Sequence, residues 1–312
     1  MGEFLSNLVQ LTANGVINGA MYALLGIGFG LILSVSGRFH IAFTVTYTLA
    51  AYIAAAAGLA MGAPFWVSAI LGGIAAAVLG VAMEAAIYGP LAAKSQRTGN
   101  NPLLMIFVAS LGLSIVGANV IALATLGVPS YLIGGFDNQG FNVGPITLTT
   151  LGVAIFVVGW VLVGLLQLVL TQTTLGRMIG AVRANPEMAL CVGINPKTVY
   201  LVVFALGSFI GGIAGVLHAT QTSATTTMGL VPFFYALVVA FVSGLNSSPL
   251  RIGIVALALG LVESWSALFL PTQLTTTVVF VVLFLYVALR PVRWADVHKR
   301  FAGRTSPAAV GG

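Results

Sequence analysis

Long stretches of this chain contain no Asp, Glu, Lys or Arg, and this feature restricts the possible folds more than any other. The uncharged stretches are 4–37, 39–83, 98–136, 138–176, 198–250 and 264–289. About 20 residues of apolar helix cross the hydrocarbon core of a bilayer, so each stretch holds one or two spans. Only 6% of the residues are charged, against roughly 25% in a soluble domain. The chain is therefore an integral membrane protein, and its continuous apolar runs favour helices over a transmembrane barrel.

The pattern predicts an all-α, polytopic transmembrane helical bundle with about 8–10 spans, including half-helices. The predicted spans are 8–35, 40–60, 64–88, 102–123, 148–170, 198–221, 230–245, 252–270 and 274–290. We expect one transmembrane domain over residues 1–290, with a cytosolic loop at 171–197, and a cytosolic C-terminal tail over residues 291–312.

The basic residues are concentrated in loops and at the C-terminus. One loop holds Lys94 and Arg97, a second holds Arg177, Arg183 and Lys197, and the last 23 residues hold five more. The net charge of the chain is +6. Because the basic residues lie in loops and at the C-terminus, they form a membrane-topology pattern and do not indicate binding to nucleic acid. With these loops in the cytoplasm, the N-terminus lies outside and the C-terminus inside.

One cytosolic loop carries an unusual local pattern, RANPEMALCVGINPK at residues 183–197. Asn185 is a favoured N-cap, Pro186 suits the first helical position, and Glu187 suits the positive end of the helix dipole. Gly193 is a natural left-handed stop. The sequence therefore predicts a helix of about two turns that is capped at both ends.

This short helix needs support from outside itself, because isolated helices below about twelve residues are marginal in water. It also presents Met188, Leu190 and Val192, where a cytosolic loop would normally be polar. Two interpretations remain open. The helix fits a groove of a soluble partner, or it folds against its own membrane domain.

The same loop resembles the coupling loop of permease subunits in the branched-chain amino acid family of ABC importers, a family that includes urea and amide systems. The matching residues are Gly176, Arg177, Ala181, Asn185, Pro186, Ala189, Gly193, Ile194 and Asn195. Similar stretches occur at 14–33, 204–219 and 258–291. The chain departs from the family pattern at 38–52 and 242–253, so the resemblance leaves the exact solute open.

The resemblance implies a permease subunit of the bacterial inner membrane that carries branched-chain amino acids or a related small polar organic solute. It implies a second permease subunit, identical or different, an extracytoplasmic solute-binding protein, and two cytosolic subunits that bind ATP and Mg. The contact with those ATPases is assigned to Gly176, Arg177, Arg183, Ala184, Asn185, Pro186, Glu187, Met188, Ala189, Gly193, Ile194 and Asn195. The chain itself has no Walker A motif, and its three histidines are too few for a metal site, so we expect no enzyme, no cofactor and no metal.

A few polar residues within the predicted spans are candidates for the solute pathway. His40, Thr44 and Tyr47 follow spacings of four and three on one predicted helix face, with Phe43 beside them. Glu263 lies deep in an apolar stretch, where an ionisable group costs roughly 2.5–3.5 kcal/mol on insertion scales. Each of these residues either contacts solute or packs between helices.

Two further features concern packing within the membrane. Glu84 lies near the cytosolic end of its span, and we expect it to pair with Lys94 or Arg97. Gly207, Gly211 and Gly215 recur every four residues on one helix face, a spacing that allows two helices to approach closely.

One rival function is a secondary transporter driven by an ion gradient. Such a protein needs ionisable residues near the bilayer midplane, and only Glu263 meets that requirement. A second rival is a structural membrane subunit of a larger complex. Neither explains the capped cytosolic helix as well as the importer permease does.

Overall fold

The computed structural model describes residues 2–98, 101–130, 136–144 and 146–289. Within them, seven helical segments are long and apolar enough to span a membrane. Six are the helices α1 (Gly2–Ser36), α2 (Phe43–Met61), α5 (Pro102–Ala124), α6 (Thr150–Gln172), α9 (Pro196–Gln221) and α11 (Pro249–Ser266), and the seventh begins with α3 (Phe65–Met83). Two further helices, α10 (Leu230–Ser243) and α12 (Thr272–Leu289), contain shorter apolar segments. The predicted all-α polytopic bundle is confirmed.

Local signals set many of the helix ends. The side chains of Asn101, Thr149 and Ser248 each accept a hydrogen bond from a backbone N–H in the first turn of the helix that follows. The helices α5 and α11 also have proline in their first turn, where the missing N–H costs nothing. Gly62 ends α2 in a left-handed conformation with φ +60°.

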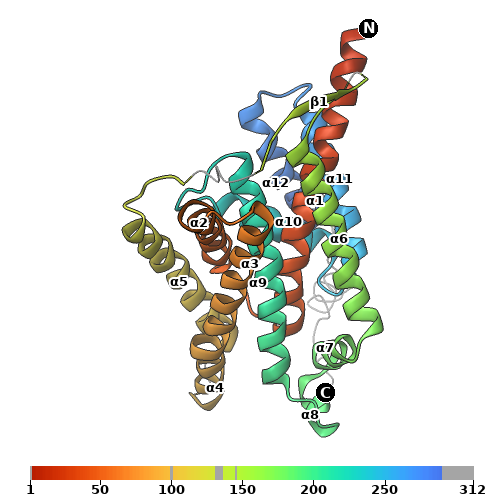
Figure 1. Cartoon of the computed structure of the whole chain (residues 1–312). Helices are drawn as coiled ribbons and strands as arrows, with labels where there is room; N and C mark the ends of the chain where they lie inside the picture. Colours follow the sequence, from red (N-terminus) through yellow and green to blue (C-terminus); the bar gives the residue numbers. More distant parts are fainter. Residues whose placement is uncertain (1, 99–100, 131–135, 145, 290–312) are drawn as a thin grey trace, which may run out of the picture.

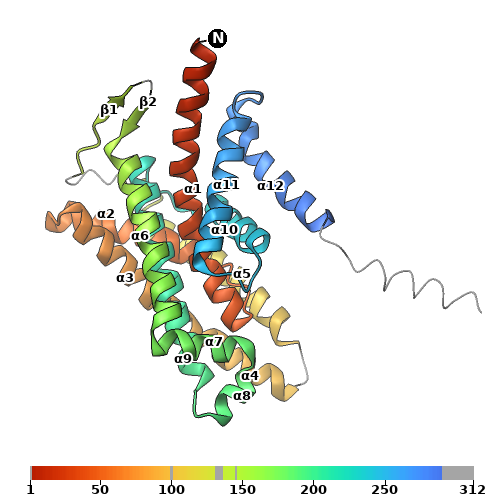
Figure 2. The same cartoon turned by 90° about the vertical axis from the view of Figure 1, so that its right-hand side faces the viewer.

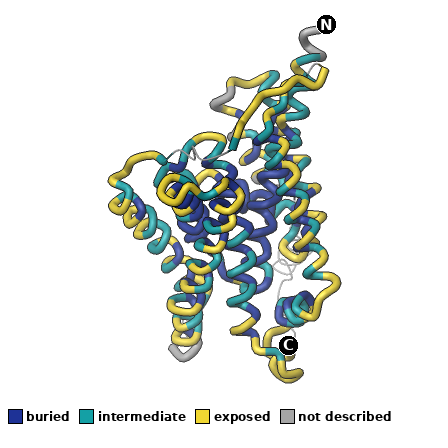
Figure 3. The backbone as a smooth tube through the Cα atoms, in the orientation of Figure 1, coloured by how far each residue is buried: buried dark blue, intermediate teal, exposed yellow. Residues whose placement is uncertain are grey.

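Helix α1 runs through the centre of the bundle, and α6, α9, α10 and α11 pack around it (Figure 1). Its apolar window is 83% buried, against 17% for α5 at the edge. Figure 3 shows the same contrast, with buried backbone gathered in the middle of the molecule. Because α1 contacts so many neighbouring helices, the side chains between α1 and these helices can form a site within this one chain.

The glycine repeat of α9 lies where this helix meets α1 and α2. A Cβ at Gly207 would lie 2.6 Å from the carbonyl oxygen of Gly28, and one at Gly211 would collide with the ring of Phe43. A Cβ at Gly215 would collide with the backbone of Tyr47. This is the close approach that the four-residue spacing predicts.

Three segments differ from the predicted spans. Residues Gly140–Val143 and Ile146–Thr149 form an antiparallel hairpin, β1 and β2, so the following helix begins at Thr150 rather than 148. A π-helical turn, η1 (Glu84–Tyr88), joins α3 to α4 (Gly89–Thr98). The loop 171–197 contains two helices, α7 (Thr174–Ala184) and α8 (Pro186–Cys191). The predicted tail, 291–312, lies outside the described residues.

Candidate functional site

The helices α7 and α8 lie at the end of the bundle opposite the N-terminus (Figure 2). Helix α7 packs on the membrane helices through Ile179 and Val182, which are 2% and 0% exposed. A Cβ at Gly176 would collide with backbone carbonyls at the end of α6, so this glycine permits the tight turn between α6 and α7. The segment that resembles a coupling loop is therefore anchored by α7 and ends in α8.

Helix α8 has the caps that its sequence predicts. The side-chain oxygen of Asn185 accepts hydrogen bonds from the backbone N–H groups of Glu187 (3.0 Å) and Met188 (3.1 Å). At the other end Gly193 has φ +81°, and the N–H of Ile194 donates to the carbonyl of Ala189 at 2.9 Å. The helix ends at Cys191, two residues before the predicted stop at Gly193.

The apolar side chains of this segment point away from the bundle. Met188, Leu190 and Val192 are 66%, 58% and 72% exposed, whereas Ala189 is buried against the chain. The remaining residues assigned to ATPase contact are exposed or half-buried, apart from Gly176: these are Arg177, Arg183, Ala184, Asn185, Pro186, Glu187, Gly193, Ile194 and Asn195. Of the two interpretations of this loop, packing against the chain's own membrane domain describes α7. The apolar side chains of α8 are exposed, which favours a soluble partner for this helix.

A cavity of about 260 Å³, here called the vestibule, lies between α1, α2, α6, α9 and α10 and has both polar and apolar lining residues. Its polar lining residues are Asn18, Tyr22, Tyr47, His218, Gln221 and Tyr235. Because α9 begins beside α8 and Gln221 is its last residue, the vestibule lies toward the end of the bundle opposite α8. The tyrosine hydroxyl of Tyr47 and Nδ1 of His218 are 2.7 Å apart.

Glu263 lies behind one wall of the vestibule. The hydroxyl of Tyr235 donates to its Oε1 at 2.8 Å, and that of Tyr22 donates to its Oε2. The two tyrosine rings stack with their centroids 4.3 Å apart. Glu263 is 8% exposed and does not line the vestibule itself, whereas Tyr22 and Tyr235 do.

The predicted pathway residues do not form one face. Helix α2 begins at Phe43, so His40 precedes it, and the interpretation that His40, Thr44 and Tyr47 share a helix face is wrong for His40. Thr44 lines a second cavity of about 240 Å³ and lies 2.8 Å from the hydroxyl of Ser114. Phe43 packs against Gly211. Of the predicted group, only Tyr47 lines the vestibule, with Glu263 behind it.

His40 belongs to a buried network at the α8 end of the bundle. Its Nδ1 lies 3.0 Å from the hydroxyl of Tyr88, which donates to Ser110 at 3.0 Å. His40 is fully buried, and this burial lowers its pKa from 6.5 to about 3, so the imidazole is neutral at physiological pH.

An ion pair accompanies this network. Glu84 pairs with Arg38, and both side chains are buried. The sequence predicts Lys94 or Arg97 as the partner of Glu84, whereas the structure brings Arg38 to Glu84 from the connection between α1 and α2. The side chain of Arg97 lies outside the described residues. The guanidinium carbon of Arg38 also lies 5.0 Å from the ring centroid of Tyr200, within the range of a cation–π contact.

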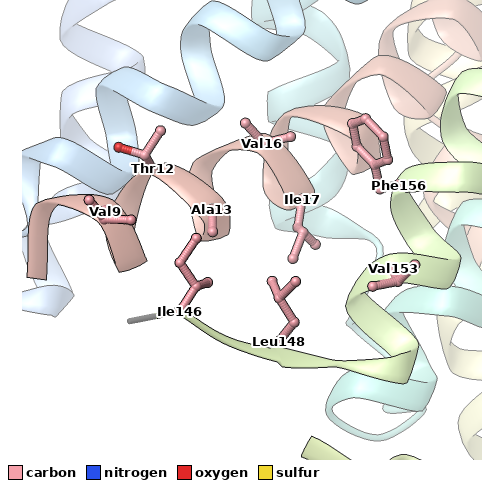
Figure 4. Close-up of a pocket in the computed structure, with 9 residues that line it drawn as sticks. All are labelled: Val9, Thr12, Ala13, Val16, Ile17, Ile146, Leu148, Val153 and Phe156. Atoms are coloured by element: carbon pink, nitrogen blue, oxygen red, sulfur yellow. The ribbon is translucent and has the colours of Figure 1, made fainter. Parts of the chain in front are cut away.

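An apolar groove beside the N-terminal half of α1 offers no comparable chemistry. It has a volume of about 400 Å³ and lies between α1, β2 and α6 (Figure 4). Its one side-chain hydroxyl, on Thr12, already donates to Leu8 and accepts from the indole N–H of Trp265. The rest of the groove's lining is apolar, whereas six polar side chains line the vestibule.

Sequence reasoning missed several of these residues. Asn18, Tyr22 and Tyr235 are polar groups within apolar helices, which is the same signal that singled out Glu263, although nothing in the sequence links them to it. Helix α7 was also missed, although Leu175, Met178, Ile179 and Val182 follow helical spacing.

Comparisons with known proteins agree with this architecture. The family described as "Branched-chain amino acid transport system / permease component" matches residues 11–289. The chain is 28% identical over 305 residues to the high-affinity branched-chain amino acid transport system permease protein BraD of Pseudomonas aeruginosa, covering 93% of this chain and 96% of BraD. It is 26% identical over 310 residues to the permease protein LivH of Salmonella typhimurium, with the same coverage.

A solved structure, PsaBC from Streptococcus pneumoniae in complex with Fab, is similar with a TM-score of 0.49 and 14% identity, covering 91% of this chain and 95% of that chain. The family match alone spans most of the residues, from the first half of α1 to the end of α12. This chain therefore belongs to the family of permease components of branched-chain amino acid transport systems.

Proposed function

We propose that this chain is one of the membrane-spanning subunits of an ATP-binding cassette importer, and that it forms part of the path for a branched-chain amino acid or a related small polar organic solute. The observation that carries the proposal is α8, a capped helix with an exposed apolar surface at one end of the bundle. Relatives named as branched-chain amino acid permease proteins support the choice of solute.

The proposal requires partners that supply energy and solute. Two cytosolic subunits would bind ATP and Mg and hold α8, a second permease subunit would complete the path, and a solute-binding protein would deliver solute outside the cell. Recognition of an amphipathic helix in a groove is a common mode of protein contact. The exposed side chains of Met188, Leu190 and Val192 fit this mode.

The orientation follows from charge. In the described part of the chain, Arg177, Arg183 and Lys197 lie in or beside α7 and α8, and α4 with Lys94 lies at the same end of the bundle (Figure 1). Because basic loops stay in the cytoplasm, α8 is cytosolic and the N-terminus is outside. The vestibule then opens toward the outer face of the bacterial inner membrane.

In the proposed mechanism, ATP binding closes the two ATPases and moves their grooves together with α8. Asn185 and Gly193 hold α8 rigid, and α7 connects it to the membrane helices. The motion switches the path between outward and inward access. This chain supplies the path and the point of attachment, and the hydrolysis of ATP occurs in the partners.

The test disrupts α8 while leaving the membrane domain intact. Pro186→Gly loosens the start of the helix, Leu190→Ser removes an exposed apolar group, and Arg183→Glu reverses a charge beside it. We expect each variant to lose ATP-driven uptake and copurification of the ATPases, at normal expression. Val143→Ser is the control, because Val143 is 53% exposed on the hairpin at the opposite end. Uptake at the wild-type rate in all three variants would refute the proposal.

A secondary transporter remains the alternative, and energy supply separates the two functions. ATP depletion should abolish uptake by an ABC importer, whereas dissipation of the ion gradient should not when ATP is maintained. Glu263 is the one membrane carboxylate that suggested a coupling ion, and its two oxygens already accept hydrogen bonds from Tyr22 and Tyr235. Uptake that survives ATP depletion and collapses with the gradient would favour the alternative.

A further inference from the structure

We infer that the second permease subunit binds to the face of this chain formed by α2, α5 and the start of α10, here called the docking face, and that it covers the second cavity there. The inference rests on the proposed function, which requires a second permease subunit without fixing its position. The support comes from polar side chains within the membrane span and from the sparse packing of α5.

The second cavity has a polar lining that reaches the surface of the bundle. Its polar lining residues are Thr44, Thr48, Ser114, Asn119, Thr226 and Thr227. Thr44 and Thr48 are buried, whereas Asn119 and Thr227 are exposed. The cavity therefore opens at the docking face.

These polar groups lie within the membrane-spanning part of the chain. Ser114 is near the middle of α5 (Pro102–Ala124), a helix long and apolar enough to cross the bilayer. The hydroxyl groups of Thr44 and Ser114 are 2.8 Å apart, so Thr44 lies at the same depth. Asn119 is about 7.5 Å further along α5, which keeps it inside the helix.

Asn119 lies on the exposed face of α5. It follows Val108, Leu111 and Ile115 at helical spacing, and these three side chains are 60%, 42% and 57% exposed. Nδ2 of Asn119 donates to the carbonyl of Ile115 at 2.8 Å, which uses one of the two N–H groups of the amide. Lipid tails offer no hydrogen bonds, and polar groups within a membrane normally face protein or a water-filled cavity. The docking face is therefore covered by protein or by water enclosed between proteins.

Helix α5 is also the candidate span that the described chain covers least. Its apolar window is 17% buried, and it packs mainly on α2, α4 and η1. Figure 1 shows it at the edge of the molecule. On its exposed side, Gly112 has no atom within 4 Å of an added Cβ, so a helix of another subunit can approach closely.

Helix α6 provides the contrast. Its apolar window is 22% buried, so it is nearly as uncovered as α5. Its exposed residues from Val153 to Leu168 are all apolar, and lipid tails satisfy such a surface. Polarity within the span therefore assigns the second subunit to α5 and leaves α6 to the lipid.

The docking face also defines the chemistry of its partner. The partner must span the membrane and present hydroxyl or amide groups at the depth of Ser114 and Asn119, so that the second cavity closes into a polar space between the two proteins. A permease subunit of the same fold, including a second copy of this chain related by a two-fold axis, presents such a face.

The first test locates the second subunit by photo-crosslinking in the complete complex in lipid nanodiscs. The photoreactive residue p-benzoylphenylalanine replaces either Ile115, on the docking face, or Val161, which is 52% exposed near the middle of α6. We expect an adduct with a second permease subunit from position 115 and not from position 161, with the crosslinked peptides identified by mass spectrometry. Lack of this adduct at position 115, or its formation at position 161, would overturn the inference.

The second test adds bulk to a surface that is open in the single subunit. Gly112→Leu should lower the recovery of the second permease subunit with the tagged chain by about tenfold, because it overfills a packed contact. Gly164→Leu, on α6, is the matched control and should leave recovery unchanged. Both glycines lack atoms within 4 Å of an added Cβ, so the single chain should unfold at the same temperature in both variants. Equal recovery in the two variants would contradict the inference.

Neither test depends on transport, so the inference and the proposed function can fail separately. A complex that imports leucine with ATP, but gives no adduct with a permease from position 115, would overturn the docking face and leave the importer intact. A complex with this adduct, and with the loss of recovery in Gly112→Leu, would support the docking face even if ATP drove no import, a result that would reject the proposed function.

Discussion

The buried pair of Arg38 and Glu84 makes a sharp prediction about stability. Both side chains are nearly inaccessible, at 6% and 4% exposure, and burial lowers the pKa of Arg38 to about 10, so its guanidinium stays charged at neutral pH. Glu84→Gln keeps the shape of the side chain and removes its charge. Arg38 is then left as a buried charge without its counter-ion, and breaking such a pair costs about 3–5 kcal/mol.

Thermal unfolding of the purified protein in nanodiscs measures this cost. With a shift of about 2–4 °C for each kcal/mol, Glu84→Gln should unfold roughly 6–20 °C below the wild type. The double variant with Arg38→Met removes both charges and should recover much of the loss, because replacing a whole buried pair is often neutral. The two single changes are therefore not additive.

The exposed carboxylate of Glu187 provides the comparison, because it lies on the surface of α8. Glu187→Gln should change stability by less than about 0.5 kcal/mol, as surface substitutions usually do. If Glu84→Gln unfolds at the same temperature as Glu187→Gln, or if the double variant is no more stable than Glu84→Gln alone, then desolvated charge does not dominate this site.

Three other predictions concern packing, capping and pH. Gly215→Ala should destabilise the bundle by about 1–3 kcal/mol through collision with Tyr47, whereas Gly164→Ala, with no atom within 4 Å of the added Cβ, should not; thermal unfolding of both variants checks this. Asn185→Ala should cost about 1 kcal/mol of helix stability, seen as several-fold faster amide exchange in α8. The pKa of His40 is lowered to about 3 by burial, so the unfolded chain binds more protons below pH 6.5, and stability should fall as the pH drops toward 3. His40→Asn should make that fall in unfolding temperature shallower.

Features that depend on neighbours in the sequence could be predicted. The uncharged stretches located the apolar helices to within a few residues, because the length of a helix in a bilayer is set by the membrane itself. The start and stop of α8 followed from Asn185, Pro186 and Gly193, since each acts on the backbone within one turn. The hairpin at 140–149 was missed because two strands of four residues each resemble a loop when they are read without their pairing.

Features that depend on distant contacts could not be predicted. Tyr22 and Glu263 are separated by 241 positions, and no local pattern indicates that two helices so far apart in the chain meet there. The pairing of Glu84 with Arg38 was missed for the same reason, since nearby Lys94 was the simpler partner. The prediction that His40 and Thr44 share a helix face is wrong because α2 begins at Phe43, after His40.

Helix α9 connects the regions that the proposed mechanism uses. It begins at Pro196, directly after the α8 segment, and its 26 residues span about 39 Å. Near its start Tyr200 lies over Arg38, along its middle the glycine repeat brings its backbone against α1 and α2, and near its end His218 lines the vestibule. Close-packed interfaces shift between discrete arrangements rather than deforming continuously. We therefore propose that a displacement of α8 is transmitted along α9 to the contact between His218 and Tyr47, which would link the proposed ATPase contact at one end of the helix to the vestibule at the other.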